Sequence, residues 1–468
     1  MRTRRSRSCS GRCGSRRYPW TKRQQEYGRN GHGPLDETAV KLRTKKQYYS
    51  SVMPDRARWA TQAVHESLSD TPVVVVNGAR QVGKTTLVRG LAFFGTHQFV
   101  SLDDPAARAF AKADPRGFVD RKVDTFVIDE VQLEPALFRA IKASVDVDRR
   151  PGRFLLTGSS RLLSAPDMAD SLVGRVEAVE LWPFSQGELD GRREGFVETV
   201  VQDQGSLLSI TGPGRQEVLE RICRGGFPEL IERRVDRRAA WFNSYVKTTI
   251  EKVVREIGDL ERLAEIPRLL RLCAAQTAGE LNIADVSNQL GIPARTGGAY
   301  LARLSSAFLV QLIPAWATNL SAKVVRKPKL AIVDSGLAAH LIGENPTTLA
   351  ARPTALGPLL ETFVVNELRS QIANGTTHST MWHFRDRGGV EVDIVLELPD
   401  GRVIGIEVKA TSSPAPADLR GLRFLQERLG ARFVAGVLLT LAPDSFRFGD
   451  GLYALPVSAL WQSDLPVH

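Results

Sequence analysis

The chain has 468 residues, 43% hydrophobic and 25% charged, which is the composition of an ordinary globular protein with room for about three domains. No segment approaches the ~18 consecutive apolar residues that a transmembrane helix needs, so a membrane partner is not expected. Four cysteines (Cys9, Cys13, Cys223, Cys273) are too few and too scattered for a disulfide framework, and Cys9 and Cys13 lack a second ligand pair for zinc. A reducing, cytoplasmic location is therefore expected.

The net charge of +11 is confined to the start of the chain. Residues 1–50 contain 14 Lys or Arg and 3 Asp or Glu, which leaves 49 basic and 49 acidic residues in the remainder. This Arg-, Ser- and Gly-rich segment has little apolar periodicity, so we expect residues 1–52 to be a disordered basic tail. Two interpretations stay open: a non-specific nucleic-acid-binding arm, or a leader upstream of a true start at Met53.

The first predicted strand is followed by a glycine-rich loop. Residues 73–76 are four valines, and β-branched residues without alternation predict a strand buried on both faces. Gly78 to Thr85 then has the pattern G-x-x-x-x-G-K-T, with apolar residues at helical spacing from Leu87 onward. Strand, loop and helix in this order are the context of a nucleotide-binding P-loop, in which Lys84 reaches the terminal phosphates of ATP and the Thr85 hydroxyl ligates Mg²⁺. The residues expected to bind the cofactor are Gly78, Ala79, Arg80, Gln81, Val82, Gly83, Lys84, Thr85 and Thr86.

A strand ending in two carboxylates lies downstream of the loop. Residues 98–104 predict one strand, and residues 125–130 predict another that ends in Asp129 and Glu130, the Walker B pattern. Asp129 is expected to hold Mg²⁺ through water, and Glu130 to orient or deprotonate the attacking water. A further strand over 153–160 ends in small hydroxyl residues, where a γ-phosphate sensor would lie. Alternating strands and helices predict a parallel, doubly wound α/β sheet with chemistry at the carboxyl ends of its strands.

These motifs resemble those of the prokaryotic AAA-type ATPases that carry a C-terminal domain of unknown function with a restriction-endonuclease-like core. The resemblance covers residues 54–468 and rests on GARQVGKTT (78–86), IDEVQ (128–132), LTGSS (156–160), GRVE (174–177) and LWPFS (181–185). It implies that Thr157 or Ser159 senses the γ-phosphate and that Arg175 is an arginine finger or sensor, with a structural salt bridge as the alternative for Arg175. ATP and Mg²⁺ are the expected cofactors, and DNA, RNA and further copies of the chain are candidate partners.

The middle of the chain is predicted to be helical. Residues 190–215 are rich in Gly and polar residues and predict a loop or insertion, whereas residues 216–275 have helical spacing. Residues 282–310 predict a helix, a Gly-containing turn and a second helix, the pattern of a winged-helix or DNA-reading helix-turn-helix module. The second helix would present Arg295, Thr296, Tyr300 and Arg303. A packing role between domains is the alternative, because Gly297 and Gly298 weaken a helix and the module is neutral overall.

The C-terminal part predicts the element order αβββαβ. The expected elements are a helix over 357–372, strands over 381–385, 390–396 and 403–409, a helix over 418–429 and a strand over 433–439. Glu361 lies on the helix and Asp393 on the second strand, while Glu407 and Lys409 share a face of the third. Carboxylates on adjacent strands can hold a divalent metal, and a lysine beside them can position water. The set resembles the Asp…Glu-x-Lys motif of restriction-endonuclease-like nucleases; acids retained only for folding or regulation are the alternative.

The predicted molecule is a multidomain α/β ATPase that couples ATP hydrolysis to nucleic-acid engagement or cleavage. The alternative is a regulatory ATPase switch whose C-terminal domain binds a partner without cutting. The expected divisions are a tail (1–52), an AAA-type ATPase domain (53–235), a helical region with a winged-helix-like module (236–320) and a restriction-endonuclease-like domain (321–468). The candidate catalytic residues are Lys84, Glu130, Arg175 and Lys409; the candidate metal ligands are Thr85, Asp129, Glu361, Asp393 and Glu407; Asp129 and Thr157 complete the nucleotide-binding set.

Overall fold

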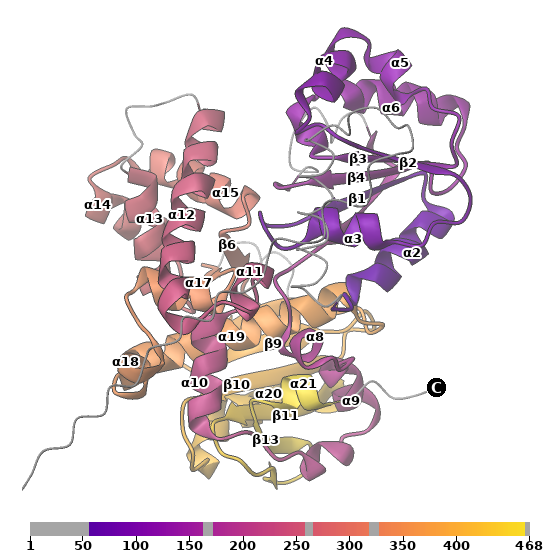
Figure 1. Cartoon of the computed structure of the whole chain (residues 1–468). Helices are drawn as coiled ribbons and strands as arrows, with labels where there is room; N and C mark the ends of the chain where they lie inside the picture. The colour runs from indigo at the N-terminus through magenta and orange to yellow at the C-terminus, as the bar shows by residue number, and fades with distance from the viewer. Residues whose placement is uncertain (1–55, 162–171, 258–264, 318–326, 464–468) are drawn as a thin grey trace, which may run out of the picture. The chain divides into compact units, whose positions relative to one another are not determined.

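The computed structural model describes residues 56–161, 172–257, 265–317 and 327–463 (Figure 1). All of them fall within the unit Arg56–His468. The expected basic tail and the expected start at Met53 lie outside the described residues. Within those ranges, no helix is long and apolar enough to cross a membrane.

The first sheet has five parallel strands in the order β2-β3-β4-β1-β5. Its strands are β1 (Val73–Asn77), β2 (His97–Ser101), β3 (Thr125–Asp129), β4 (Phe154–Gly158) and β5 (Val176–Glu180). Val74 and Val76 of β1 belong to one hydrophobic core, and Val73 and Val75 belong to another. Successive side chains of a strand point to opposite faces, so the predicted burial of this strand on both faces is confirmed.

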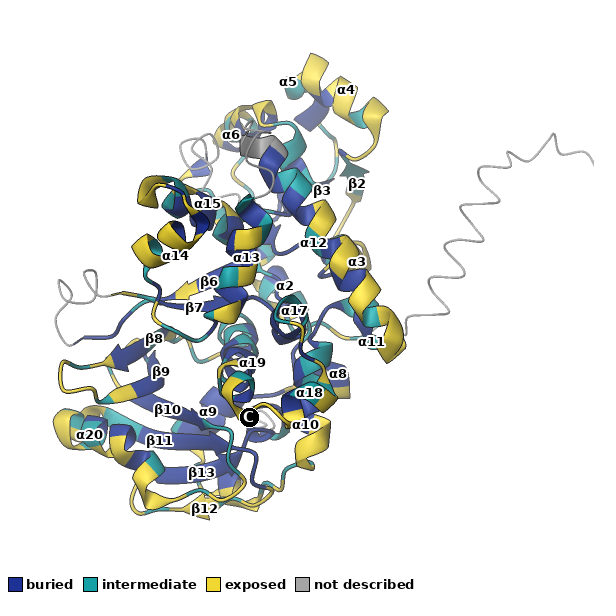
Figure 2. Cartoon of the chain, turned by 90° about the vertical axis from the view of Figure 1, so that its left-hand side faces the viewer, coloured by how far each residue is buried: buried dark blue, intermediate teal, exposed yellow. Residues whose placement is uncertain are grey.

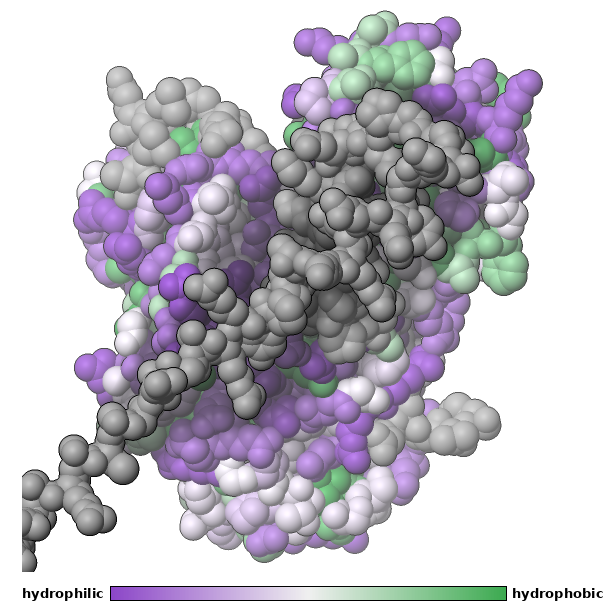
Figure 3. All heavy atoms as spheres, in the orientation of Figure 1, coloured by the Kyte–Doolittle hydropathy of each residue, from purple (hydrophilic) through white to green (hydrophobic). Residues whose placement is uncertain are grey.

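Helices cover both faces of this sheet (Figure 1). The helices are α2 (Ala60–Asp70) and α3 (Lys84–Gly90) on one face, and α4 (Pro105–Ala113), α5 (Pro115–Val119) and α6 (Ala136–Val147) on the other, with a 3-10 turn at Val131–Leu133. Hydrophobic side chains gather on the surface over α4 and α5 (Figure 3), where 44% of the Phe110 surface is exposed.

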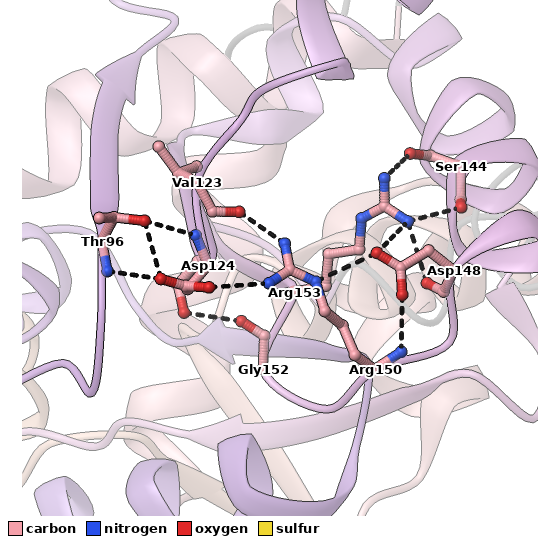
Figure 4. A network of polar contacts seen from close by, with 9 residues as sticks. Thr96, Val123, Asp124, Ser144, Asp148, Arg150, Gly152 and Arg153 are labelled. Carbon is pink, nitrogen blue, oxygen red and sulfur yellow. Dashed lines mark hydrogen bonds and ion pairs between the residues drawn. The ribbon is translucent and has the colours of Figure 1, made fainter.

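A polar network ties together the amino ends of β2, β3 and β4 (Figure 4). The Asp124 carboxylate accepts hydrogen bonds from the Thr96 N–H at 2.7 Å and from Arg150 at 3.1 Å. The bonds from Thr96 hold the pKa of Asp124 below its usual value. The Thr125 hydroxyl donates to the Gly152 carbonyl at 2.8 Å. These contacts join the amino ends of the three strands. Ligands of open α/β sheets bind at the opposite, carboxyl ends of the strands.

The segment 190–215, predicted to be a loop or insertion, is helical over half of its length. It contains the end of α8 (Gln186–Asp190), α9 (Phe196–Gln202), a 3-10 turn (Ser206–Ser209) and the start of α10 (Arg215–Arg224). Most of α9 is buried, and the Glu198 carboxylate accepts from the backbone N–H groups of Thr376 and Thr377, each at 3.0 Å. The prediction was wrong for α9, because Glu198, one of the polar residues that suggested a solvated loop, bonds to a part of the chain about 180 positions away.

Helices dominate the segment from α10 to α18. They are α11 (Pro228–Ile231), α12 (Val235–Ile257), α13 (Glu265–Ala275), α14 (Ile283–Leu290), α15 (Ala294–Ser306), α17 (Ser335–Leu341) and α18 (Pro346–Ala350). An antiparallel hairpin of β6 (Val310–Ile313) and β7 (Lys329–Ile332) follows α15, and Ile313 pairs with Lys329. The expected division at residue 320 separates these two paired strands.

The second large sheet has six strands in the order β12-β13-β11-β10-β9-β8. Its elements are α19 (Pro353–Asn374), β8 (Thr380–Arg385), β9 (Glu391–Glu397), β10 (Val403–Lys409), a 3-10 turn (Pro416–Leu419), α20 (Arg420–Leu429), β11 (Phe433–Thr440), β12 (Phe446–Arg447), β13 (Leu452–Pro456) and α21 (Ala459–Gln462). The predicted αβββαβ order is present from α19 to β11, and β9 and β10 are antiparallel. Figure 2 shows β10, β11 and β13 as buried strands, because α19 and α9 pack against the sheet on one side and α20 on the other.

Candidate functional site

The glycine-rich loop lies between the end of β1 and the start of α3. Gly78 to Gly83 form the loop, and Lys84, Thr85 and Thr86 make the first turn of the helix. Gly83 has a φ of 95°, a conformation that only glycine adopts without strain. Gln81 also has a positive φ, of 63°. These two left-handed residues fold the loop back toward the amino end of α3.

Lys84 is enclosed by its own loop. Its ammonium donates to the carbonyl oxygens of Gly78 at 3.0 Å and Ala79 at 2.9 Å, and the residue is buried. Burial lowers the pKa of Lys84 to about 8, although the charges of Glu130 and Asp129 oppose this shift. The ammonium is therefore already inside the curve of the loop that would surround a phosphate.

Asp129 joins four elements at the carboxyl end of the sheet. Thr85 of α3 donates its hydroxyl to Asp129 at 3.0 Å, Thr157 of β4 donates at 2.6 Å and Ser101 of β2 donates at 3.2 Å. Carboxylate and hydroxyl oxygens of this kind are the ligands that Mg²⁺ prefers. The predicted metal ligands Thr85 and Asp129 are therefore in contact, and this donor set fits Mg²⁺.

Glu130 follows β3 with a φ of 56°, which is unusual for a residue with a side chain. Its N–H donates to the Thr157 hydroxyl at 3.0 Å, and its carboxylate accepts from the Ser159 hydroxyl at 3.1 Å and from the Gln132 side chain. Both candidate sensor residues therefore contact the acidic pair, Thr157 through Asp129 and Ser159 through Glu130.

A lysine that the sequence did not reveal also reaches this place. Lys252 of α12 donates to the Ser159 hydroxyl at 2.7 Å and lies 3.9 Å from the Glu130 carboxylate. Ser159 and Lys252 are 93 positions apart, and Lys252 stands in an ordinary amphipathic helix, so no local pattern marks it.

A second cluster of charged residues, which we call the acid cluster, comprises Glu361, Asp393 and Glu407. The structure brings these three residues together, with Lys409 donating to Glu407 at 2.7 Å. Lys329 of β7 lies among them and donates to Glu361 at 2.7 Å and to Asp393 at 3.0 Å.

Burial raises the pKa values of two carboxyl groups in the acid cluster. Burial and then the Asp393 charge raise the pKa of Glu361 to about 8 and that of Glu407 to about 7. Burial opposes protonation of Lys329, but the two carboxylates beside it raise its pKa above the usual value. Among the described residues, no group of three or more His, Cys, Asp or Glu is arranged to hold a metal ion. The cation between Glu361 and Asp393 in this arrangement is an ammonium.

Three family models match separate parts of the chain. Residues 70–190 match an AAA domain, residues 215–348 match a domain of unknown function (DUF8612) and residues 356–460 match a domain of unknown function (DUF4143). The AAA match spans the whole of the P-loop together with Asp129, Glu130 and Thr157. The chain contains an AAA-type P-loop ATPase domain.

Relatives of similar length exist in mycobacteria. An uncharacterized protein of Mycobacterium bovis and one of Mycobacterium tuberculosis are each 29% identical to this chain over 370 residues, which is 78% of this chain and 76% of the relative. Among solved structures, the Walker-type ATPase PABY2304 of Pyrococcus abyssi is 16% identical, with 60% of this chain and 94% of that chain covered and a TM-score of 0.36. A point variant of RuvB from Thermotoga maritima is 15% identical, with 55% and 86% covered and a TM-score of 0.23. TM-scores this low support no conclusion about the activity of this chain.

Arg175 lies at the wrong end of the ATPase domain to contact a nucleotide in the same chain. Its carbonyl accepts from the N–H of Val73, the first residue of β1, whereas the P-loop follows the last residue of that strand. Its guanidinium pairs with Asp146 at 2.7 Å and holds the pKa of Asp146 below its usual value. The prediction of a sensor within the chain is therefore corrected, and the structural salt bridge that was the alternative is present.

The helix-turn-helix prediction is correct for the elements and wrong for one side chain. Asn282 caps α14, Gly291 ends it in a left-handed conformation, and α15 follows. Arg295 and Arg303 are exposed on α15, but Tyr300 is 4% exposed and faces the core. Tyr300 lies one helical turn after the buried Gly297, so the two residues share the face of α15 that packs inward.

Proposed function

We propose that this protein binds ATP with Mg²⁺ and hydrolyses it. The observation that carries the proposal is the meeting of Thr85, Asp129 and Thr157 beside the loop that encloses Lys84. A P-loop lysine, a Walker B aspartate and a glutamate directly after it form the usual apparatus of phosphoryl transfer to water.

Each residue has a role that follows from its position. The Lys84 ammonium would leave the loop carbonyls and neutralise the terminal phosphates, and Thr85 and Asp129 would hold Mg²⁺. Bound Mg²⁺ supplies charge neutralisation between the phosphates. Glu130 would accept the proton of the attacking water, and Ser159 and Thr157 hold Glu130 in place for that step.

The test is Mg²⁺-dependent release of phosphate from ATP by the full chain. Lys84→Ala should abolish release because the charge that meets the terminal phosphates is removed. Lys112→Ala, which changes an exposed lysine of the same domain, should release phosphate at the wild-type rate. Activity that persists in Lys84→Ala would place hydrolysis elsewhere.

We also propose that ATP turnover is coupled to nucleic-acid engagement through α15. What supports this is the pair of exposed arginines, Arg295 and Arg303, on the second helix of a helix-turn-helix. Replacing both with Ala should weaken DNA or RNA binding and reduce the slope of log K against log salt by about 2. Replacing Arg420 and Arg423, exposed on α20, with Ala is the matched control and should change neither quantity.

The two functions considered for the C-terminal domain are nucleic-acid cleavage and regulation by partner binding. The position of Lys329 favours regulation, since an ammonium already neutralises Glu361 and Asp393. Labelled single- and double-stranded DNA and RNA, incubated with Mg²⁺ or Mn²⁺ and ATP, decide between them. Cleavage that Asp393→Ala and Lys409→Ala remove, while ATP hydrolysis survives, would establish the nuclease; no cleavage would leave the regulatory switch.

A further inference from the structure

Lys329 is an enclosed charged group in the C-terminal half that no predicted function uses. It begins β7, is 7% exposed, and its ammonium lies between carboxylates from α19 and β9. A lysine is almost never buried unless it is paired. Its hydrogen bonds bridge elements that are 32 and 64 positions away along the chain.

The remaining carboxylate oxygens of the acid cluster differ in whether they accept a hydrogen bond. Asp393 uses its second oxygen to accept from the Val408 N–H at 3.0 Å, and Glu407 uses one oxygen for Lys409. The other Glu407 oxygen, Oε2, is buried and has no hydrogen-bond partner among the residues that the structure describes. A buried oxygen of this kind is costly unless a cation or donor reaches it at some stage.

We propose that Lys329 and a divalent cation compete for Glu361 and Asp393, so that β7 acts as a plug in the acid cluster. With Lys329 withdrawn, the Glu361 and Asp393 oxygens that now accept from its ammonium would be left to a divalent ion, which takes carboxylate oxygens as ligands. With Lys329 in place, its ammonium neutralises the negative charge of Glu361 and Asp393 instead. This inference rests on the metal-dependent function considered above for the C-terminal domain, and the arrangement with Lys329 in place is its metal-free state.

The strand that carries Lys329 is joined to the ATPase domain by a continuous run of contacts. On β7, the Leu330 N–H donates to the Gly279 carbonyl, and the Val333 N–H that follows the strand donates to the Leu309 carbonyl. Leu309 lies just beyond α15, and the Arg161 N–H donates to the carbonyl of Ser306, the last residue of that helix.

Arg161 itself lies two residues after Ser159, the hydroxyl that contacts Glu130. Its guanidinium donates to the Ser305 hydroxyl at 3.1 Å and stacks on the Phe308 ring. Contacts therefore connect the end of β4 to β7. Coupling of the two sites also requires an element with two states that both sites bias, and the proposal assigns that role to Lys329.

The experiment measures Mn²⁺ binding to the nucleotide-free full-length chain by electron paramagnetic resonance. Lys329→Met should bind one additional Mn²⁺, or bind it at least ~10-fold more tightly than the wild type. Lys327→Met, the same change at an exposed lysine two residues earlier, should behave as the wild type does. Lys329→Met combined with Asp393→Asn should lose the gain, which assigns it to the acid cluster.

Each outcome decides a separate question. Equal Mn²⁺ affinity in the wild type and Lys329→Met, lost in Asp393→Asn, would overturn the plug while leaving a metal site. No Mn²⁺ at the cluster in either protein would overturn both the plug and the metal-dependent state, and ATP hydrolysis would be unaffected. If Lys329→Met does not fold, Lys329→Gln, whose amide can still donate hydrogen bonds to the carboxylates but carries no charge, is titrated in its place and is read in the same way.

Discussion

Glu130 combines an unusual backbone with a dense set of polar partners. A residue with a side chain at a φ of 56° is strained, and such strain persists only where the surroundings hold it. Here Thr157 accepts the Glu130 N–H, while Ser159 and Gln132 hold the carboxylate. With this backbone the Glu130 carboxylate lies against Ser159, just beyond the end of β4, and under the proposed function this is where the attacking water would be held.

Glu130→Gln should separate binding from chemistry. The amide keeps the shape of the side chain but cannot take a proton, so hydrolysis should fall by about 10²–10⁴-fold while ATP stays bound. Filter binding of labelled ATP and phosphate release measure the two quantities. Lys84→Ala should lose binding as well, and an equal loss of ATP binding in both variants would contradict this division of roles.

Lys252 should matter for turnover although it lies outside the matched AAA segment. Lys252→Ala removes the ammonium that contacts Ser159 and Glu130, so kcat should fall by about 100-fold with little change in KM. Lys247→Ala, which changes an exposed lysine on the same helix, is the control. Equal rates for both variants, at equal melting temperatures, would show that Lys252 has no part in positioning the catalytic groups.

At the scale of elements, the helix-turn-helix depends on one close approach. Gly297 of α15 is buried, and a Cβ at that position would overlap the hydroxyl of Ser287 on α14. A Cβ at Gly298 would meet nothing within 4 Å in the described part of the chain. The two glycines that weakened the helix prediction therefore differ in their role. A glycine at position 297 lets α15 pack against α14, and no such contact requires one at position 298.

Adjacent substitutions should therefore have opposite effects on stability. Gly297→Ala overpacks the helix contact and should lower the free energy of unfolding by about 1–3 kcal/mol. Gly298→Ala should raise it by about 0.5–1 kcal/mol, because alanine loses less backbone entropy in a helix. Urea denaturation followed by circular dichroism compares the variants, and a shift of the same sign in both would refute the packing argument.

At the scale of the whole molecule, the ATPase domain and the acid cluster are joined through α15 and β7. If ATP withdraws Lys329, the amides of Leu330 and Val333 should exchange hydrogen faster when Glu130→Gln is loaded with ATP and Mg²⁺ than when it is nucleotide-free. Adding Arg161→Ala, which removes the contacts to Ser305 and Phe308, should abolish that difference. Unchanged exchange on ATP binding would mean that the nucleotide does not reach β7.

From the sequence alone we predicted the P-loop, the Walker B pair, the αβββαβ order and the grouping of Glu361, Asp393, Glu407 and Lys409. These features depend on residues that are neighbours along the chain, where the alternation of strands and the glycine spacing leave a direct record.

The prediction from sequence failed for α9 and Tyr300, and it did not reveal Lys252 or Lys329. The hydrogen-bond partners of Lys252 and Lys329 lie between 32 and 93 positions away, and an ammonium's role depends on which carboxylates and hydroxyls folding brings within about 3 Å of it. Only the tertiary structure could decide that the acid cluster already contains a cation.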